Sequence, residues 1–344
     1  MDNIHKILHS IDCSSRREVF ATIIHIEGSA YRKEGTSMLI KEDGTQVGIL
    51  SGGCLETDLA LQVKEVLDKG LSRTLIYDMR DEDDLSWGQG AGCNGVVHVL
   101  LEPIDGNMLQ HLNKVKTCLE DGKEVMVVKK LTNTWSVSDY LFLTEDGAVF
   151  GEWTGILDNE MQHTFRQEKR SGLVFIAELS AYVYLHTFLP KPRLIIFGAG
   201  YDAMPLASLA SKTGFYVTVS DWREALCNKN KFPEADQCIV GFPKDAITSV
   251  KLTPRDFVVI LTHHFQRDQE LLELLLNKQL RYLGILGSKL RMNRLFKGKE
   301  VPSFIKTPVG LPIGAEGPEE IAVSILAQLI QILRKPSIEV RFSK

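Results

Sequence analysis

The stretch RLIIFGAGYDA, residues 193–203, determines the fold of this chain. An apolar run leads into Gly198, and the pattern Gly-x-Gly-x-x-Ala follows. A helix-like segment comes next, and a second apolar run, residues 215–220, ends at Asp221. Strand, glycine turn, helix, strand and an acidic residue about 20 residues downstream form the dinucleotide-binding fingerprint. The pattern predicts that Gly198 and Gly200 let the backbone approach a pyrophosphate, whose charge the helix N-terminus favours.

The sequence after residue 190 alternates apolar runs with helical patterns, which is typical of a parallel sheet covered by helices. Strands are predicted at 193–197, 215–220, 237–240, 256–261, 282–286 and 307–309, and helices at 201–212, 266–278, 289–297 and 318–334. We therefore predict an α/β protein: a C-terminal Rossmann-like doubly wound parallel sheet, preceded by a mixed α/β N-terminal domain. Pro190-Lys191-Pro192 favours an extended connector between them. The expected domains are residues 1–190 and 191–335, with a C-terminal tail at 336–344.

The first 190 residues contain shorter apolar runs, which predict mixed α/β structure. Strands are expected at 19–27, 37–40, 46–50, 73–77, 96–101, 123–129, 140–144 and 181–188, and a helix at 55–67. Residues 151–175 are weakly patterned and predict no element.

Composition narrows the class of protein. A chain of 344 residues favours two domains. A net charge of −4 gives no basic field for nucleic acid, and no apolar run is long enough to span a membrane. The cysteines lack CxxC spacing and the first residues lack a signal-peptide pattern, so we expect a cytoplasmic protein with reduced thiols.

Ligands of doubly wound sheets bind beyond the carboxyl ends of the strands, and this rule brings several loops into one crevice. The candidate binding residues there are Gly198, Gly200, Asp221, Arg223, His263, Ser288, Lys289 and Arg291. Asp221 is expected to bind a ribose hydroxyl; Arg223 would instead meet a 2′-phosphate, and the cations near residue 289 a phosphate. The alternative is a Rossmann-like domain that has lost its ligand and keeps the turn for packing.

His263 and His264 are adjacent, so on a strand their side chains would point to opposite sides. No Cys/His/Asp cluster at metal-ligand spacing accompanies them. Loop histidines are therefore favoured over a metal site, and a general acid/base role for one of them stays open.

Two cysteines lie in glycine-rich turns of the first domain. Ser51-Gly52-Gly53-Cys54 comes directly before the helix expected at 55–67, and Cys93 lies within residues 88–95. A helix N-terminus favours the thiolate, and the Gly52-Gly53 backbone can cradle an anion. Thiolates suit soft metals or the carriage of sulfur. The alternative is that both cysteines are small buried residues in tight turns.

In their order and joint presence, these motifs resemble the XdhC/CoxI family of xanthine dehydrogenase accessory factors. In the first domain the resemblance rests on GSAYR (28–32), SGGCLE (51–56) and WGQGAGCNG (87–95). In the second it rests on FGAG (197–200), DWR (221–223), LTH (261–263), GILGS (284–288), PIGAE (312–316) and PEE (318–320).

The resemblance implies a cytosolic chaperone that binds molybdenum cofactor and assists its sulfuration and insertion into xanthine dehydrogenase or a related molybdenum hydroxylase. Such a protein is a cofactor-binding maturation factor rather than an enzyme. Cys54 and Cys93 would belong to the cofactor-handling region, as molybdenum contacts or sulfur carriers. The Rossmann-like domain would hold the pterin phosphate, NAD(P) or another nucleotide. A cysteine desulfurase as a second partner and a homodimer are also expected.

Two other functions stay open from the residues alone. An NAD(P)-dependent oxidoreductase would use the fingerprint, with His263 or His264 as proton donor, although no separate catalytic motif accompanies it. A partner-binding module would keep an empty Rossmann-like domain and bind a hydroxylase, but no small molecule.

Overall fold

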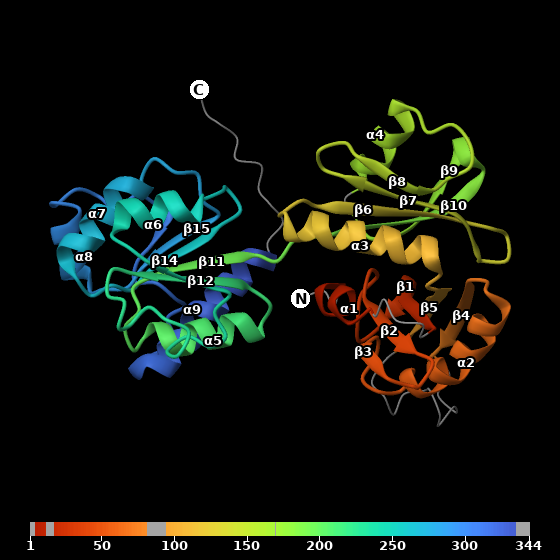
Figure 1. Ribbon diagram of the computed structural model, residues 1–344, viewed down its shortest axis with the longest axis horizontal. Coiled ribbons are helices and arrows are strands. Elements are labelled where there is room, and N and C mark those ends of the chain that lie inside the picture. The colour runs from red at the N-terminus through yellow and green to blue at the C-terminus, as the bar shows by residue number, and fades with distance from the viewer. Residues whose placement is uncertain (1–3, 12–16, 81–93, 169, 335–344) are drawn as a thin grey trace. The chain divides into compact units, whose positions relative to one another are not determined.

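The computed structural model describes residues 4–11, 17–80, 94–168 and 170–334 (Figure 1). The chain divides into two compact units, Met1–Pro190 and Lys191–Lys344. Each unit has hydrophobic clusters of its own, so each is a separately packed body.

The N-terminal unit begins with an antiparallel sheet in the order β3-β2-β1-β5-β4. Its strands are β1 (Glu18–Ser29), β2 (Ser37–Lys41), β3 (Gln46–Gly48), β4 (Arg73–Asp78) and β5 (Asn94–Pro103). One face packs against helix α2 (Glu56–Lys69) through Leu59, Val63 and Val66. These residues recur at helical spacing, so they form one apolar stripe along the helix.

A second antiparallel sheet follows in the same unit, in the order β8-β7-β6-β10-β9. Its strands are β6 (Val125–Leu131), β7 (Val137–Thr144), β8 (Val149–Glu152), β9 (Gly172–Ile176) and β10 (Ala181–Phe188). Helices α1 (Ile4–Ser10) and α3 (Gly106–Glu120) share one core cluster with residues of both sheets. Helix α4 (Asn159–Gln167) buries Phe165 in a separate cluster on this second sheet, and the short helix η2 (Ala177–Leu179) joins β9 to β10.

The C-terminal unit is a parallel sheet in the order β13-β12-β11-β14-β15-β16. Its strands are β11 (Arg193–Phe197), β12 (Tyr216–Asp221), β13 (Gln237–Val240), β14 (Phe257–Ile260), β15 (Tyr282–Ile285) and β16 (Ile305–Lys306). Helices α5 (Ala203–Lys212) and α9 (Gly317–Arg334) cover one face, and α6 (Pro243–Val250), α7 (Phe265–Leu275) and α8 (Lys289–Leu295) the other (Figure 1).

Strand β11 is buried on both faces of this sheet. Leu194 and Ile196 pack with α5 and α9, whereas Ile195 and Phe197 pack with the helices of the other face. A parallel strand covered on both sides reads as a continuous apolar run, which explains the sequence before the glycine turn. The strand order reverses between β11 and β14, so the topological switch point lies beside that turn.

The predicted fold class is confirmed: a doubly wound parallel sheet follows a mixed α/β unit. The strand predicted at 307–309 is wrong, because β16 occupies Ile305–Lys306 and residues 307–309 lie beyond it. Pro308 has no N–H group for a strand ladder. The sequence analysis missed α1, α3, α4, α6, β8 and β9. Helix α4 buries only Phe165, so it lacks the apolar stripe by which such a helix is recognised.

Replacing Gly198 by alanine tests the glycine turn. Its φ is +114°, in the left-handed region, and a Cβ there would lie 2.5 Å from the Leu261 carbonyl oxygen. We expect Gly198→Ala to lower the free energy of unfolding by about 2 kcal/mol or more, because strain and overlap both act. Urea denaturation followed by circular dichroism measures the loss.

Gly200→Ala is the matched control in the same turn. No atom lies within 4 Å of its Cβ position. The expected change is about 0.5 kcal/mol or less. Equal losses in the two variants would contradict this account of the turn.

Candidate functional site

The glycine turn between β11 and α5 leaves part of its backbone open. The Gly198 N–H donates to the Ser220 carbonyl oxygen at 2.8 Å, which ties the turn to β12. At Gly200 the space where a Cβ would stand is empty, so a ligand has room to approach the backbone. This is the region where the fingerprint predicts contact with a pyrophosphate.

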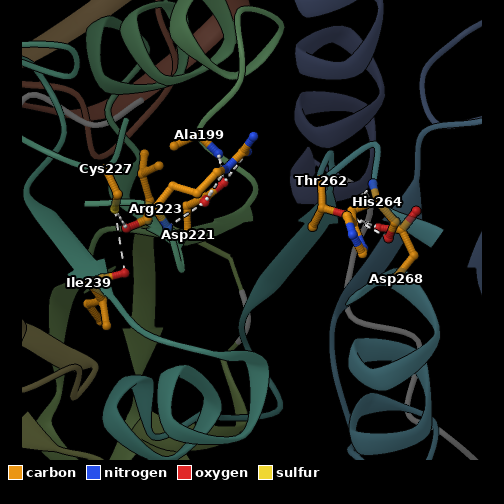
Figure 2. Close-up of polar contacts among 9 residues, drawn as sticks. Ala199, Asp221, Arg223, Cys227, Ile239, Thr262, His264 and Asp268 are labelled. Carbon is orange, nitrogen blue, oxygen red and sulfur yellow. Dashed lines mark hydrogen bonds and ion pairs between the residues drawn. The ribbon is translucent and has the colours of Figure 1, made fainter. Parts of the chain in front are cut away.

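Asp221 ends β12, and its carboxylate is fully occupied (Figure 2). Oδ2 accepts the Ala199 N–H at 2.8 Å and Arg223 Nη2 at 2.8 Å. Oδ1 accepts the Arg223 backbone N–H and Nε, both at 2.9 Å. Burial raises the pKa of this carboxyl, but the hydrogen bonds from Arg223 and Ala199 outweigh burial and leave the pKa below its ordinary value. Asp221, which is predicted to bind a ribose hydroxyl, therefore binds Ala199 and Arg223 in this structure.

Arg223 is held from two directions. Its guanidinium forms the two side-chain hydrogen bonds to Asp221, and its Cζ lies 4.5 Å from the centroid of the Trp222 ring. The Trp222 ring also makes an edge contact with His264, at a centroid distance of 5.5 Å. At the end of β12, the Arg223 guanidinium is therefore held in place by Asp221 and lies against the indole ring of Trp222.

The loop after β14 is held by a second buried acid, Asp268. The Thr262 hydroxyl donates to its carboxylate and accepts the N–H of His264 at 3.0 Å (Figure 2). Arg291 Nη2 lies 2.6 Å from the other carboxylate oxygen. Arg291, predicted as a phosphate ligand, is therefore already paired with a carboxylate.

His263 joins this loop to the glycine turn. Its backbone lies in the left-handed region, at φ +56°, and its Nε2 lies 2.6 Å from Oδ2 of Asp202. Asp202 directly precedes α5, so the contact crosses the switch point. A non-glycine residue in the left-handed region is uncommon and often marks a functional position.

Ser288 and Lys289 stand at the start of α8. Ser288 caps the helix by accepting the Arg291 N–H at 3.3 Å. Lys289 is exposed. Of the three predicted cations, Lys289 faces solvent, whereas Arg223 and Arg291 are each held by a carboxylate.

In the N-terminal unit, the turn that carries Cys54 is held by Glu56, the first residue of α2. Glu56 Oε1 accepts the N–H groups of Leu50 at 3.1 Å and Ser51 at 2.7 Å, and Oε2 accepts the Ser51 hydroxyl. Burial pushes the pKa of Glu56 up, but these hydrogen bonds outweigh burial and the pKa lies below its ordinary value.

The same turn keeps open backbone beside the thiol. Ser51 Oγ accepts the N–H groups of Gly53 at 3.2 Å and Leu55 at 3.1 Å. No atom lies within 4 Å of a Cβ position at Gly52 or Gly53. Cys54 is a free, half-buried thiol beside the cluster under α2. A rigid turn thus presents a thiol and accessible backbone together.

Cys93, the second predicted thiol, lies outside the described residues. Its neighbours Asn94 and Gly95 begin β5. A Cβ on Gly95 would lie 2.4 Å from the Glu27 carbonyl oxygen, and one on Gly28 would lie 2.7 Å from the Asn94 carbonyl oxygen. Glycine at both positions therefore permits the close approach of β1 and β5.

Among the described residues, no group of three or more His, Cys, Asp or Glu side chains could hold a metal ion. The helices within the same ranges include none long and apolar enough to cross a membrane.

The sequence analysis assigned no role to Glu56, Asp202 or Asp268, although each lies close to a predicted site residue. Glu56 ends SGGCLE, Asp202 stands inside the fingerprint, and Asp268 is in the first turn of α7. An acid that close to a glycine turn or a helix start is a signal, because it can accept the free N–H groups there.

A parallel sheet with a glycine turn at its switch point, following an antiparallel unit with a thiol-bearing turn, defines a two-unit α/β binding protein. Comparison with known proteins gives the family. The description "XdhC Rossmann domain" matches residues 194–329, "BH1974-like, central domain" matches 106–189, and "XdhC and CoxI family" matches 14–78.

Relatives extend over nearly the whole chain. It is 45% identical over 338 residues to a Bacillus subtilis (strain 168) protein named as a probable xanthine dehydrogenase subunit, with 98% of this chain and 100% of that protein covered. It is 24% identical over 340 residues to "Molybdenum cofactor insertion chaperone PaoD" of Escherichia coli (strain K12), covering 93% and 84%. The crystal structure of a xanthine dehydrogenase from Bacillus halodurans matches with a TM-score of 0.88 and 49% identity, covering 100% and 99%.

The chain therefore belongs to the XdhC and CoxI family, which confirms the resemblance found in its motifs. It is an accessory protein of that family, related to a molybdenum cofactor insertion chaperone.

Removing the Glu56 carboxylate should loosen the thiol-bearing turn. In Glu56→Ala the buried N–H groups of Leu50 and Ser51 lose their acceptor, so we expect unfolding free energy to fall by about 2–4 kcal/mol. The rate at which Cys54 is alkylated in the folded protein should rise. Glu65→Ala, on the exposed side of the same helix, is the control and should leave the stability close to that of the parent, because its ion pairs are exposed to solvent. If Glu56→Ala proved as stable as the parent, the Glu56 carboxylate would not be what holds this turn in place.

The hydrogen bonds that the Asp221 carboxylate accepts from Ala199 and Arg223 predict a dependence of stability on pH. Because its folded pKa is depressed, its stabilising contribution is complete above the ordinary value of 3.8 and is lost as the pH falls through the folded pKa. We expect the thermal midpoint to fall as the pH decreases from about 4 through the folded pKa of Asp221, and Asp221→Asn to flatten this part of the profile. Scanning calorimetry measures both. Asp245→Asn, at an exposed carboxyl of α6, should leave the slope unchanged, and an equally steep profile for Asp221→Asn would refute the assignment.

Proposed function

We propose that this chain binds molybdenum cofactor as cargo and assists its sulfuration and its insertion into xanthine dehydrogenase or a related molybdenum hydroxylase. The observation that carries the proposal is the Cys54 turn, a free thiol on a loop with open backbone that a buried carboxylate holds in place. Membership of the family and the likeness to a protein named as a molybdenum cofactor insertion chaperone support it.

The residues of the turn suit such a cargo. A cysteine thiolate is a soft ligand for a metal and an established carrier of sulfur. The N–H groups of Gly53 and Leu55 already bond to Ser51 Oγ. Those of Gly52 and Cys54 have no acceptor recorded among the described residues, so they are the groups left to meet an anion.

In this proposal each unit has a binding site of its own. Cys54 contacts the metal or carries sulfur, and Cys93 is a second thiol of the same region. The Rossmann-like unit holds the pterin phosphate or a nucleotide at the carboxyl ends of its strands, where the backbone of Gly200 is open and Lys289 is an accessible cation. The glycine turn supplies N–H groups and the lysine a charge, which is what a phosphate group requires.

The proposed partners follow from the cargo. A cysteine desulfurase supplies the sulfur, and a molybdenum hydroxylase receives the finished cofactor. The protein acts in the cytoplasm as a homodimer and has no turnover reaction of its own.

One observation favours a second candidate function, an NAD(P)-dependent oxidoreductase. The contact between His263 and Asp202 at the switch point positions an imidazole that can donate a proton. The filled carboxylate of Asp221 counts against it, because that acid would have to bind the ribose. Calorimetric titration with NAD+ and NADP+ decides: absence of binding by both removes this candidate.

The thiol contact is tested by replacing Cys54. The parent and Cys54→Ser are produced in cells that make the cofactor and purified without oxygen. We expect bound molybdenum to fall by about tenfold or more in the variant, because a serine hydroxyl is a poor soft ligand. Mass spectrometry of metal and pterin gives the occupancy. Cys118→Ser, at a half-buried thiol of α3, is the control, and equal molybdenum in all three proteins would exclude Cys54 as a contact.

A further inference from the structure

The filled carboxylate of Asp221 changes what the end of β12 can recognise. In a dinucleotide site the acid at this position binds ribose hydroxyls. A carboxylate offers about four lone-pair sites. Four N–H donors of Ala199 and Arg223 already use them, so a ribose diol finds no free acceptor on Asp221 (Figure 2).

The group that reaches solvent instead is the Arg223 guanidinium. Its side chain is 41% exposed, whereas that of Asp221 is 0% exposed. Of the five N–H groups of a guanidinium, Nε and Nη2 each give one to Asp221, and no acceptor for the others is recorded among the described residues. A guanidinium fixed between a carboxylate and the Trp222 ring is suited to phosphate, which it binds through parallel hydrogen bonds.

A small cavity beside Asp221 and Trp222 is lined by a second polar group whose hydrogen-bonding capacity is unused, the Ser220 hydroxyl. It lies at the carboxyl end of the sheet on the face of α6 and α7, and its lining includes Phe197, Ser220 and Thr262. Ser220 is 2% exposed, and its Oγ has no hydrogen-bond partner among the described residues. A buried hydroxyl without a partner is costly, so the cavity offers a polar contact to whatever fills it.

Arg267 limits the size of this cavity, which has room for about one water molecule. Its guanidinium carbon lies 4.6 Å from the Phe242 ring centroid and 5.8 Å from that of Trp222. Its ion-pair partner is Glu270 on the same helix, at 2.8 Å. A planar heteroaromatic ring can replace the guanidinium against the two aromatic side chains if Arg267 turns away.

We propose that the end of β12 is a phosphate-selecting subsite. Arg223 binds a phosphate monoester, and the fused heteroaromatic ring of the same ligand takes the place of the Arg267 guanidinium against Phe242 and Trp222. The ligand is a pterin or a purine that carries a phosphate monoester, and a ligand with a free diol at this place is refused. This inference deepens the proposed function and rests on it for the pterin; a nucleotide is the other source of the same chemistry.

The selection is local rather than the result of a broad positive field. Asp221 and Glu270 balance the charges of Arg223 and Arg267. Glu224, next to Arg223 in sequence, and Asp245, in the first turn of α6, are exposed. Recognition therefore comes from the directed N–H groups of Arg223. The hydrogen bonds to Asp221 fix the plane of its guanidinium group.

Two matched ligand pairs test the subsite in the full-length protein by titration calorimetry. One pair is 2′-AMP and adenosine; the other is the oxidised, metal-free pterin of the cofactor before and after phosphatase treatment. We expect the phosphorylated member to bind about tenfold or more tightly, as directed charge-assisted hydrogen bonds would produce. Binding should also change the fluorescence of Trp222, and Trp222→Phe should remove that change.

Variants of Arg223 separate selection from simple loss of folding, which circular dichroism monitors. Arg223→Gln should abolish the discrimination and strengthen binding of adenosine, because the Asp221 acceptors become free. Arg223→Lys keeps the charge but lacks the fork, so its discrimination should be intermediate. Arg255→Gln, which precedes β14 at the amino ends of the parallel strands, is the control and should discriminate like the parent.

The outcomes separate this inference from the proposed function. Equal affinities within both pairs, discrimination that survives Arg223→Gln, or no binding of either phosphorylated probe would overturn the inference. Discrimination between 2′-AMP and adenosine alone supports the subsite and counts against the pterin as its ligand. Molybdenum that is retained through Cys54 while the subsite fails these tests leaves the proposed function standing.

Discussion

Three buried carboxylates accept hydrogen bonds from the loops around them, and these bonds fix the loops that the protein offers to a ligand. Glu56, Asp221 and Asp268 are all buried. An ionised carboxylate without donors is strongly disfavoured in an interior, so each gathers N–H and hydroxyl groups from the surrounding loop. Glu56 closes the turn before α2, Asp221 closes the glycine turn, and Asp268 closes the loop after β14. Each loop is thereby set before any ligand arrives.

This arrangement lets glycines serve two different purposes within one turn. Gly198 is confined by the Leu261 carbonyl oxygen, whereas the space above Gly200 is empty. Gly52 and Gly53 resemble Gly200 in this respect. A carboxylate holds the shape of each turn, and the open glycines keep its backbone accessible. Gly53, at φ +110°, is also required by the conformation of its turn. A preorganised turn of this kind loses little conformational entropy when an anion binds.

Much of the C-terminal unit could be predicted from the sequence, because β11 is buried on both faces and its apolar run leads directly into the fingerprint. Helix α3 was missed although Met108, Leu112 and Val115 stand at helical spacing, so its signal was present. The site was less predictable. Asp221 and Arg223 are two residues apart and can bind each other or a ligand. The Ala199 N–H helps to decide between these, and its position depends on how the turn packs.

The glycines that bring β1 and β5 together have a consequence for sequence divergence. Gly28 and Gly95 are required by the spacing of two backbones, whatever the protein carries or serves. A methyl group on either one meets a carbonyl oxygen of the opposite strand, so neither can change alone without shifting the pairing. If both glycines are invariant in an alignment, the close spacing of β1 and β5 is therefore a sufficient explanation. In such an alignment, invariance of the glycines that follow Cys93 in sequence is not by itself a mark of chemistry.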